Sequence, residues 1–145
     1  TNYCGKWIRH GSWYPDKQLR LFDRTKGAWK GHMIHEKFEV HPGEKVGHIK
    51  GDLLHYSYYS IAEHVAQANH FTDITARVAF EKGKKSNWVK IIFSPIIKFK
   101  RDYILKLGFL DGYYGFIVCQ ISANATFLKY IKLKQLHDNK AKDGD

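Results

Sequence analysis

The clearest hydrophobic pattern in this chain lies between residues 82 and 106. Its large apolar residues recur every three or four positions, which places them on one face of an α-helix; they are Trp88, Ile92, Ile96, Phe99 and Tyr103. Further apolar residues widen this face. A narrow polar stripe separates its edges and consists of Lys90, Ser94, Lys98 and Arg101. Pro95 predicts a kink or a new helix start. The segment therefore predicts a helix with a broad apolar face and a basic edge.

Helical signals begin earlier, at residue 60. Ser60 and Glu63 have the spacing of a capping box, in which each side chain bonds a free backbone amide of the first turn. The pattern predicts a helix from Ser60 to about Asn69. Thr72 or Asp73 can cap a second helix after it.

Residues 112–128 contain no charged side chain. A membrane-spanning helix needs about 20 mostly apolar residues, and this run is shorter and includes several polar ones. It predicts a core or interfacial helix. The residues after 136 are mostly polar, and we expect a frayed polar tail over 139–145.

The first 56 residues show short alternating runs separated by turn residues, which is typical of strands and loops. Strands are expected within 3–8, 19–22 and 49–56, with a turn at 41–44. The fold class is therefore α+β, with N-terminal strands and loops followed by C-terminal amphipathic helices. We divide the chain into a strand and loop part (1–58), a helical part (59–138) and the tail.

Composition narrows the class of partner. The 24 Lys and Arg against 14 Asp and Glu give a net charge of +10, which favours an anionic partner such as nucleic acid, a membrane surface or a phosphorylated substrate. Cys4 and Cys119 are far apart and match no metal or redox spacing, so they fit a reducing compartment.

Four ordered blocks resemble a subgroup of family 2 glycosyltransferases that includes the lipopolysaccharide core glucosyltransferases acting on heptose. The blocks are Gly5–Asp16 followed by Leu19–Phe22, Trp29–Gly31 with His35–Glu36, Leu53–Tyr58, and Gly108–Gly112 leading to Phe127–Leu133. Together they cover about residues 1–136. Several blocks in order are more specific than any single short motif.

The resemblance implies a GT-A fold, in which a nucleotide-sugar half precedes an acceptor half. The blocks match the acceptor half, so residues 1–58 would form part of the GT-A sheet. In the complete enzyme a divalent metal, Mg or Mn, is held with the donor diphosphate by an Asp-x-Asp motif of the first half. The only such triplet here is 143–145, in the tail. We therefore expect this chain to hold no metal and to be inactive alone.

The resemblance also implies a cellular location and binding partners. These would be a nucleotide sugar and a membrane glycolipid, at the cytoplasmic face of the inner membrane, where the protein would be peripheral.

Glu36 is the candidate catalytic residue. Inverting glycosyl transfer needs a base that accepts the proton of the acceptor hydroxyl, and a carboxylate suits this role. In the resembled family an acidic residue at this position is the expected base, and His35 beside it would bind substrate. The other interpretation is a solvated glutamate next to Lys37.

A second group of candidates could bind substrate and consists of Trp13, Tyr14, Asp16, Arg20 and His55. Aromatic rings stack on sugars, and Asp or Arg can bond hydroxyls or phosphates. His55 is also a weak candidate metal ligand, because several GT-A enzymes use a late histidine near the metal. The structural alternatives are that Trp13 belongs to the core, that Arg20 is an exposed strand residue and that His55 bonds the backbone.

The segment 82–106 holds eight Lys or Arg residues against one acid, Asp102. Its candidate membrane-interface residues are Trp88, Lys90, Phe93, Ile97, Lys98, Lys100 and Arg101. Such a segment suits an anionic membrane interface, and basic and aromatic residues together also suit nucleic acid. It could instead pack on its own domain. The resemblance favours the membrane over nucleic acid. The alternative function for the whole chain is a non-catalytic basic module that binds anionic lipid or nucleic acid.

Overall fold

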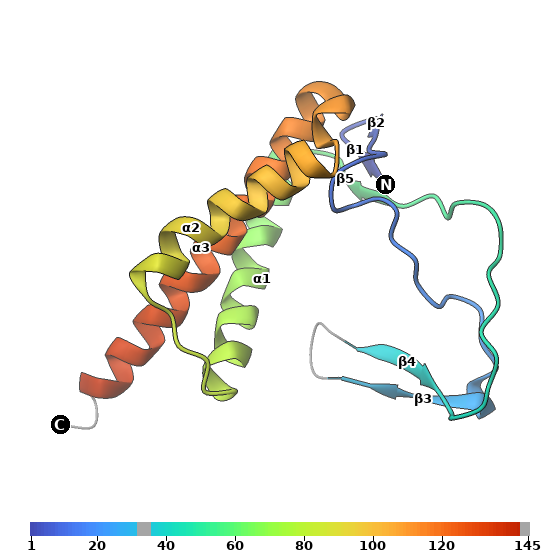
Figure 1. The fold of residues 1–145 in the computed structure, drawn as a ribbon, viewed down its shortest axis with the longest axis horizontal. Coiled ribbons are helices and arrows are strands. Elements are labelled where there is room, and N and C mark those ends of the chain that lie inside the picture. Colours follow the sequence, from blue (N-terminus) through green and yellow to red (C-terminus); the bar gives the residue numbers. More distant parts are fainter. Residues whose placement is uncertain (32–35, 143–145) are drawn as a thin grey trace. The chain divides into compact units, whose positions relative to one another are not determined.

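The computed structural model describes residues 1–31 and 36–142. The chain forms two compact units, Thr1–Pro15 with Leu54–Asp145, and Asp16–Leu53. Both appear in Figure 1. The first fifteen residues thus belong to the same unit as the helices. The predicted division had placed them with the rest of residues 1–58.

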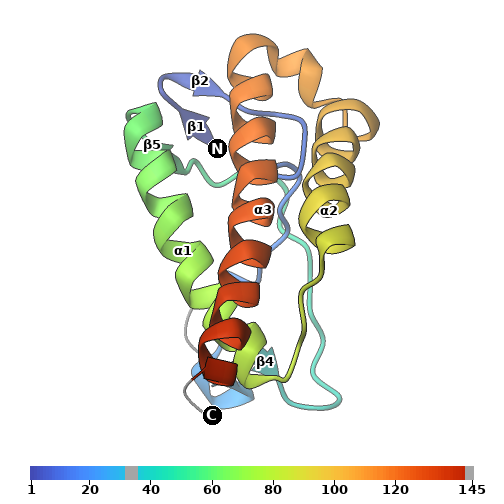
Figure 2. The same ribbon diagram turned by 90° about the vertical axis from the view of Figure 1, so that its left-hand side faces the viewer.

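The first unit is built on three α-helices in the described part of the chain: α1 (Ile61–Glu81), α2 (Trp88–Lys100) and α3 (Gly112–Lys142). Both α1 and α2 pack along α3, which lies between them (Figure 2). Strands precede helices, so the predicted α+β class with C-terminal helices is confirmed.

Helix α1 begins as predicted. Ser60 Oγ accepts from the Glu63 amide at 3.2 Å, and Glu63 accepts from the Ser60 amide at 3.3 Å. The predicted break before Thr72 is wrong. The Thr72 hydroxyl donates to the Asn69 carbonyl at 2.7 Å, and the side chain is buried, so it bonds back within one continuous helix instead of capping a new one.

The helices expected in 82–106 and 112–128 are present with other bounds: α2 is Trp88–Lys100 and α3 is Gly112–Lys142. Asn87 caps α2, and Pro95 lies inside it without ending it. A π-helical turn, η3 (Arg101–Leu105), and a 3₁₀ turn, η4 (Gly108–Asp111), connect α2 to α3. We call residues 101–113 the corner. Helix α3 continues to Lys142, so the expected frayed tail is helical up to that residue.

Three short strands complete the first unit. β1 (Asn2–Tyr3) pairs antiparallel with β2 (Lys6–Trp7) and parallel with β5 (Tyr56–Tyr58). The single strand expected over 3–8 is therefore two strands. Positive φ angles of 48° at Cys4 and 85° at Gly5 turn the chain between them. Of the strand expected over 49–56, only Tyr56 is in a strand.

The second unit is a hairpin of β3 (Gly27–Lys30) and β4 (Lys37–Val40), preceded by a 3₁₀ turn, η1 (Arg24–Lys26). The turn at 41–44 is confirmed by a bond from the Glu44 amide to the His41 carbonyl. The strand expected over 19–22 is absent. Phe22 instead stacks on Phe38 with ring centroids 3.8 Å apart, so this segment is held to the hairpin by its side chain.

Candidate functional site

Two buried aspartates of the corner hold the segment that follows β2. Asp111 is 6% exposed and accepts from the amides of Arg9 and His10 at 3.0 and 2.8 Å. Nδ1 of His10 donates to its other oxygen at 3.0 Å. The Gly11 amide donates to the Lys106 carbonyl at 2.8 Å. Residues 9–11 are therefore fixed to the turn between α2 and α3.

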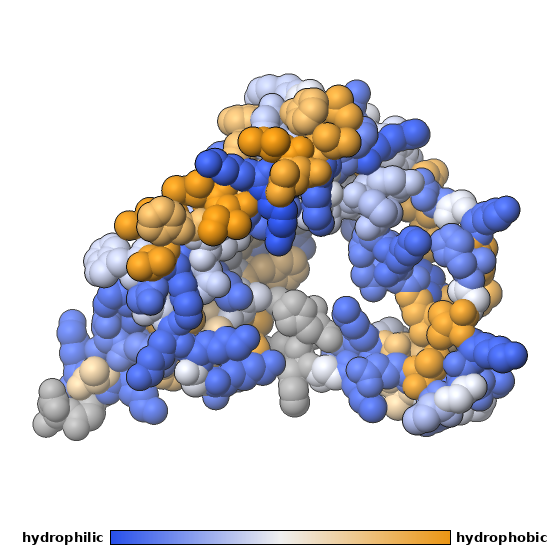
Figure 3. All heavy atoms as spheres, in the orientation of Figure 1, coloured by the Kyte–Doolittle hydropathy of each residue, from blue (hydrophilic) through white to orange (hydrophobic). Residues whose placement is uncertain are grey.

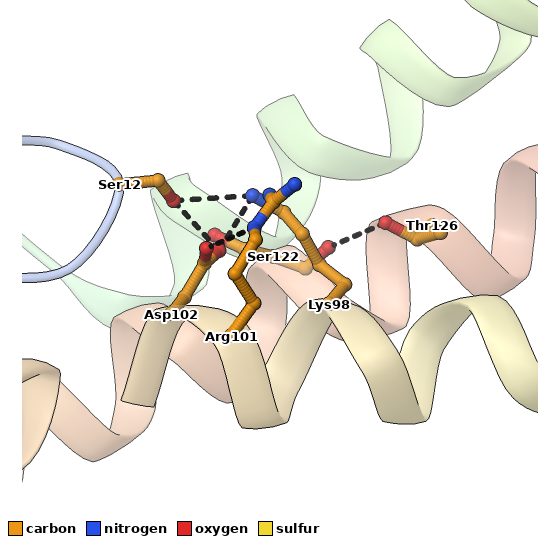
Figure 4. Close-up of polar contacts among 6 residues, drawn as sticks. All are labelled: Ser12, Lys98, Arg101, Asp102, Ser122 and Thr126. Atoms are coloured by element: carbon orange, nitrogen blue, oxygen red, sulfur yellow. Dashed lines mark hydrogen bonds and ion pairs between the residues drawn. The ribbon is translucent and has the colours of Figure 1, made fainter. Parts of the chain in front are cut away.

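Asp102 is the centre of a second group, which we call the polar cluster: Ser12, Lys98, Arg101 and Asp102 (Figure 4). Asp102 is fully buried. It accepts from Ser12 Oγ at 2.7 Å and from Arg101 Nε at 3.0 Å, and it forms an ion pair with Lys98. The Lys98 ammonium also donates to Ser12 Oγ at 3.1 Å.

The ionisation of Asp102 follows from these contacts. Burial alone raises the pKa of this carboxyl, but the hydrogen bonds from Lys98, Ser12 and Arg101 and the charge of Lys98 outweigh burial, so its pKa is lowered overall. The aspartate is therefore charged and fully partnered inside the unit.

Close packing at the corner requires small residues. A Cβ on Gly108 would lie 2.7 Å from the Asp102 carbonyl oxygen and 2.8 Å from Cys119 Sγ, distances that real contacts do not show. A Cβ on Gly115 would overlap the Gly108 carbonyl. These two glycines let α3 approach the turn that carries both aspartates.

The contacts of the polar cluster show which side of α2 faces the interior of the first unit. Ile91 is buried, Ser94 is partly buried, and Lys98, with 24% of its side chain exposed, pairs with the buried Asp102. This side of α2 therefore faces inward, while Lys90 and Arg101 at the two ends of the polar stripe are exposed. Lys98, which was expected on the basic edge, has its charge paired with Asp102 inside the unit. Six large side chains point outward, each 46–68% exposed; we call them the apolar face: Trp88, Val89, Ile92, Phe93, Ile96 and Ile97.

Trp13 belongs to an aromatic core of the same unit. Its ring centroid lies 5.7 Å from that of Tyr3 and 5.2 Å from that of His64. Tyr3 is fully buried, and its hydroxyl is hydrogen-bonded to Nδ1 of His64 at 3.1 Å. Trp13 is half-buried there, so packing accounts for it. Burial lowers the pKa of His64 to about 4.

We expect His64 to make the unit less stable in mild acid. Because its folded pKa of about 4 lies below the unfolded value of 6.5, the unfolded chain takes up the proton first, and stability falls as the pH drops from 6.5 towards 4. Between pH 7 and pH 5 the wild type should lose about 2 kcal/mol more than His64→Gln. Urea unfolding of both proteins at the two pH values measures this. Equal losses in both proteins would contradict it.

The remaining predicted site residues are divided between the two units. Tyr14 and His55 belong to the first, where both are exposed and Nδ1 of His55 lies 3.1 Å from Ser57 Oγ. Asp16, Arg20 and Glu36 belong to the second, and all three are exposed.

Asp16 accepts a bond from Gln18 at 2.7 Å. Glu36 directly precedes β4, while its neighbour His35 lies outside the described residues. Within residues 1–31 and 36–142, no three His, Cys, Asp or Glu side chains lie close enough to hold a metal ion.

Sequence reasoning did not single out Ser12, Asp102 or Asp111 as a group. One signal was available: Asp102 is the lone acid among eight basic residues. An isolated carboxylate in such a segment is a natural ion-pair partner for the lysine one turn before it.

Among known proteins, the chain is similar to glycosyltransferases over most of its length. It is 32% identical over 128 residues to the lipopolysaccharide core biosynthesis glycosyltransferase LpsC of Rhizobium meliloti (strain 1021), an alignment that covers 87% of this chain and 47% of the relative. It is 34% identical over 121 residues to an uncharacterized glycosyltransferase of Rickettsia bellii (strain RML369-C), covering 83% and 41%.

The chain thus spans less than half the length of these curated relatives. No family model matches it. No solved structure matches it either.

Proposed function

We propose that this chain is the acceptor-side part of a family 2, GT-A-type glycosyltransferase that moves a sugar from a nucleotide-sugar donor to a lipopolysaccharide core glycolipid. The similarity to LpsC, which extends over 87% of the chain, carries the proposal. The chain would supply the acceptor side. The donor diphosphate and its divalent metal, Mg or Mn, would be bound by a separate nucleotide-sugar half.

In this proposal Glu36 is the general base. Its side chain is exposed beside β4, so an acceptor hydroxyl can reach it. The carboxylate takes the hydroxyl proton while the hydroxyl oxygen forms a bond to the anomeric carbon of the donor. The bond from that carbon to the leaving diphosphate breaks, and the diphosphate keeps the electron pair. A positioned carboxylate typically contributes about 10²–10⁴-fold to such a step.

The other candidates would bind substrate, in keeping with their exposure. Tyr14, Asp16, Arg20 and His55 are all exposed residues. His35 would act beside Glu36. Trp13 contributes mainly by fixing the loop that leads to Tyr14, because its ring packs in the aromatic core.

The proposed enzyme works at the cytoplasmic face of the inner membrane as a peripheral protein. The exposed apolar face of α2 and the net charge of +10 support this location.

The test is a transfer assay with the chain joined to a nucleotide-sugar half. Radiolabelled sugar should pass from the nucleotide donor to core glycolipid presented in membranes, and the 145-residue chain alone should give none. If the joined protein binds membranes but transfers nothing from any common nucleotide sugar, the transferase proposal fails and a non-catalytic lipid-binding module takes its place.

A further inference from the structure

We propose that the apolar face of α2, together with the corner, is a docking surface that lies in the headgroup region of a bilayer rich in anionic lipids. This inference deepens the membrane partner of the proposed function by assigning it to a particular surface. Figure 3 shows hydrophobic side chains along α2 and at the corner. The occupant follows from three observations: how α2 is oriented, how far the apolar surface extends, and which charges border it.

The orientation of α2, most of whose large apolar side chains are exposed, differs from that of a typical helix on the surface of a water-soluble domain. Such a helix buries its apolar side and exposes its polar side. Here Ser94 and Lys98 face inward beside the buried Ile91, and Lys98 bonds Ser12 and Asp102. Phe93 and Ile97 are 54% and 63% exposed. Rotating the helix to bury these residues would break the contacts of the charged, buried Asp102. The ion pair therefore holds the apolar face outward.

The exposed apolar surface continues past α2. The corner adds large side chains that are 45–77% exposed, namely Ile104, Leu105, Leu107, Phe109, Leu110 and Tyr113. Trp88 at the start of α2 is 68% exposed, and Tyr113 at the end of the corner is 70% exposed. Trp and Tyr are the residues most typical of the membrane interface, because each has an apolar body and a polar group. Extended apolar surface of this kind marks an interaction site.

The charges beside this surface identify the occupant. Of the eight basic residues in 82–106, Lys98 and Arg101 bond Asp102, and the other six are exposed: Lys82, Lys84, Lys85, Lys90, Lys100 and Lys106. Asp102, the only acid in this stretch, is buried. A second copy would bring the same positive charges against these. Anionic headgroups complement them, because a negatively charged membrane surface attracts basic residues that lie near it.

The geometry favours a helix lying in the interface over a helix crossing the bilayer. Within the described residues no single helix is long and apolar enough to span a membrane. The segments Trp88–Leu105 and Gly108–Lys142 meet the length and composition criteria only as a pair, and this pair is bent by 71°. A basic border beside a helix with one apolar face is the pattern of interfacial helices.

Co-sedimentation of the 145-residue chain with vesicles tests the proposal. The chain should bind vesicles of phosphatidylcholine and phosphatidylglycerol in equal parts more tightly than vesicles of phosphatidylcholine alone. The Phe93→Ser, Ile97→Ser double variant should weaken binding to the mixed vesicles by at least about tenfold. Both side chains are already exposed, so the fold should tolerate the change.

The matched control is Val65→Ser with Phe71→Ser, which removes two apolar side chains of α1 that are 49% and 39% exposed. It should bind like the wild type. Equal binding by the Phe93, Ile97 variant and this control would overturn the proposal. So would light scattering that shows a lipid-free dimer lost only in the Phe93, Ile97 variant, because the face would then hold a second copy.

Vesicle binding needs no donor sugar, so its outcome is separate from the transfer assay. Vesicle binding without sugar transfer would refute the proposed transferase activity and support the docking surface. Sugar transfer to a detergent-solubilised acceptor without vesicle binding would refute the docking surface alone.

Discussion

Replacing Asp102 with Ala is expected to lower the free energy of unfolding by about 3 kcal/mol, since breaking a buried ion pair leaves its partner uncompensated. Asp102 is fully buried, and its removal leaves Lys98, Ser12 and Arg101 without their shared acceptor. Ser12, in the segment that follows β2, also loses the hydrogen bond that it donates to η3. Urea unfolding monitored by circular dichroism measures the change at neutral pH.

The matched control is Asp138→Ala. Asp138 pairs with Lys134 at 2.6 Å on α3, but its side chain is 52% exposed, so its loss should cost well under 1 kcal/mol. Adding Lys98→Met to Asp102→Ala should recover part of the loss, because the unpaired ammonium is then gone. If Asp102→Ala lowers the free energy of unfolding no more than Asp138→Ala does, the ion pair does not hold α2 in its observed orientation.

Replacing Glu36 with Gln is expected to lower the transfer rate of the chain joined to its nucleotide-sugar half by about 10²–10⁴-fold. Gln keeps the size of the side chain and cannot accept the hydroxyl proton. Since Glu36 is exposed, the substitution should leave the unfolding free energy within about 0.5 kcal/mol of the wild type. A rate loss without a stability loss separates chemistry from folding.

Glu39→Gln provides the comparison within the same hairpin. Glu39 is on β4, with its side chain 58% exposed, and pairs with Lys30 at 3.1 Å. Its substitution should change the transfer rate by less than about twofold, as expected for an exposed ion pair. Similar rates for Glu36→Gln and the wild type would remove Glu36 from the mechanism.

The sequence predicted local features well where one signal controls them. The Ser60 and Glu63 spacing gave the start of α1, because a capping box needs only neighbouring residues. The periodicity of 88–103 gave a helix. Thr72 was misread as a cap, since the same hydroxyl can bond a carbonyl one turn earlier inside a helix. The strand expected over 19–22 failed because Phe22 packs on Phe38, a contact that alternation alone does not reveal.

The residues of α2 do not by themselves show which side of this helix is buried. Periodicity shows that Ser94 and Lys98 share a side of the helix, and it usually implies that this side faces water. Here the partner of Lys98 is Asp102, which also bonds Ser12, a residue 90 positions away in the chain. Long-range polar contacts of this kind decide which side is buried. The same limit applied to Trp13, whose neighbours Tyr3 and His64 lie in separate elements.

The most direct measurement of the central claim is the mass of the lipopolysaccharide core made by cells whose own copy of this protein carries Glu36→Gln. We expect a core that lacks at least one sugar, with the shorter glycolipid accumulating, and a normal core in cells that carry Glu39→Gln. A complete core in the Glu36→Gln cells would contradict the account.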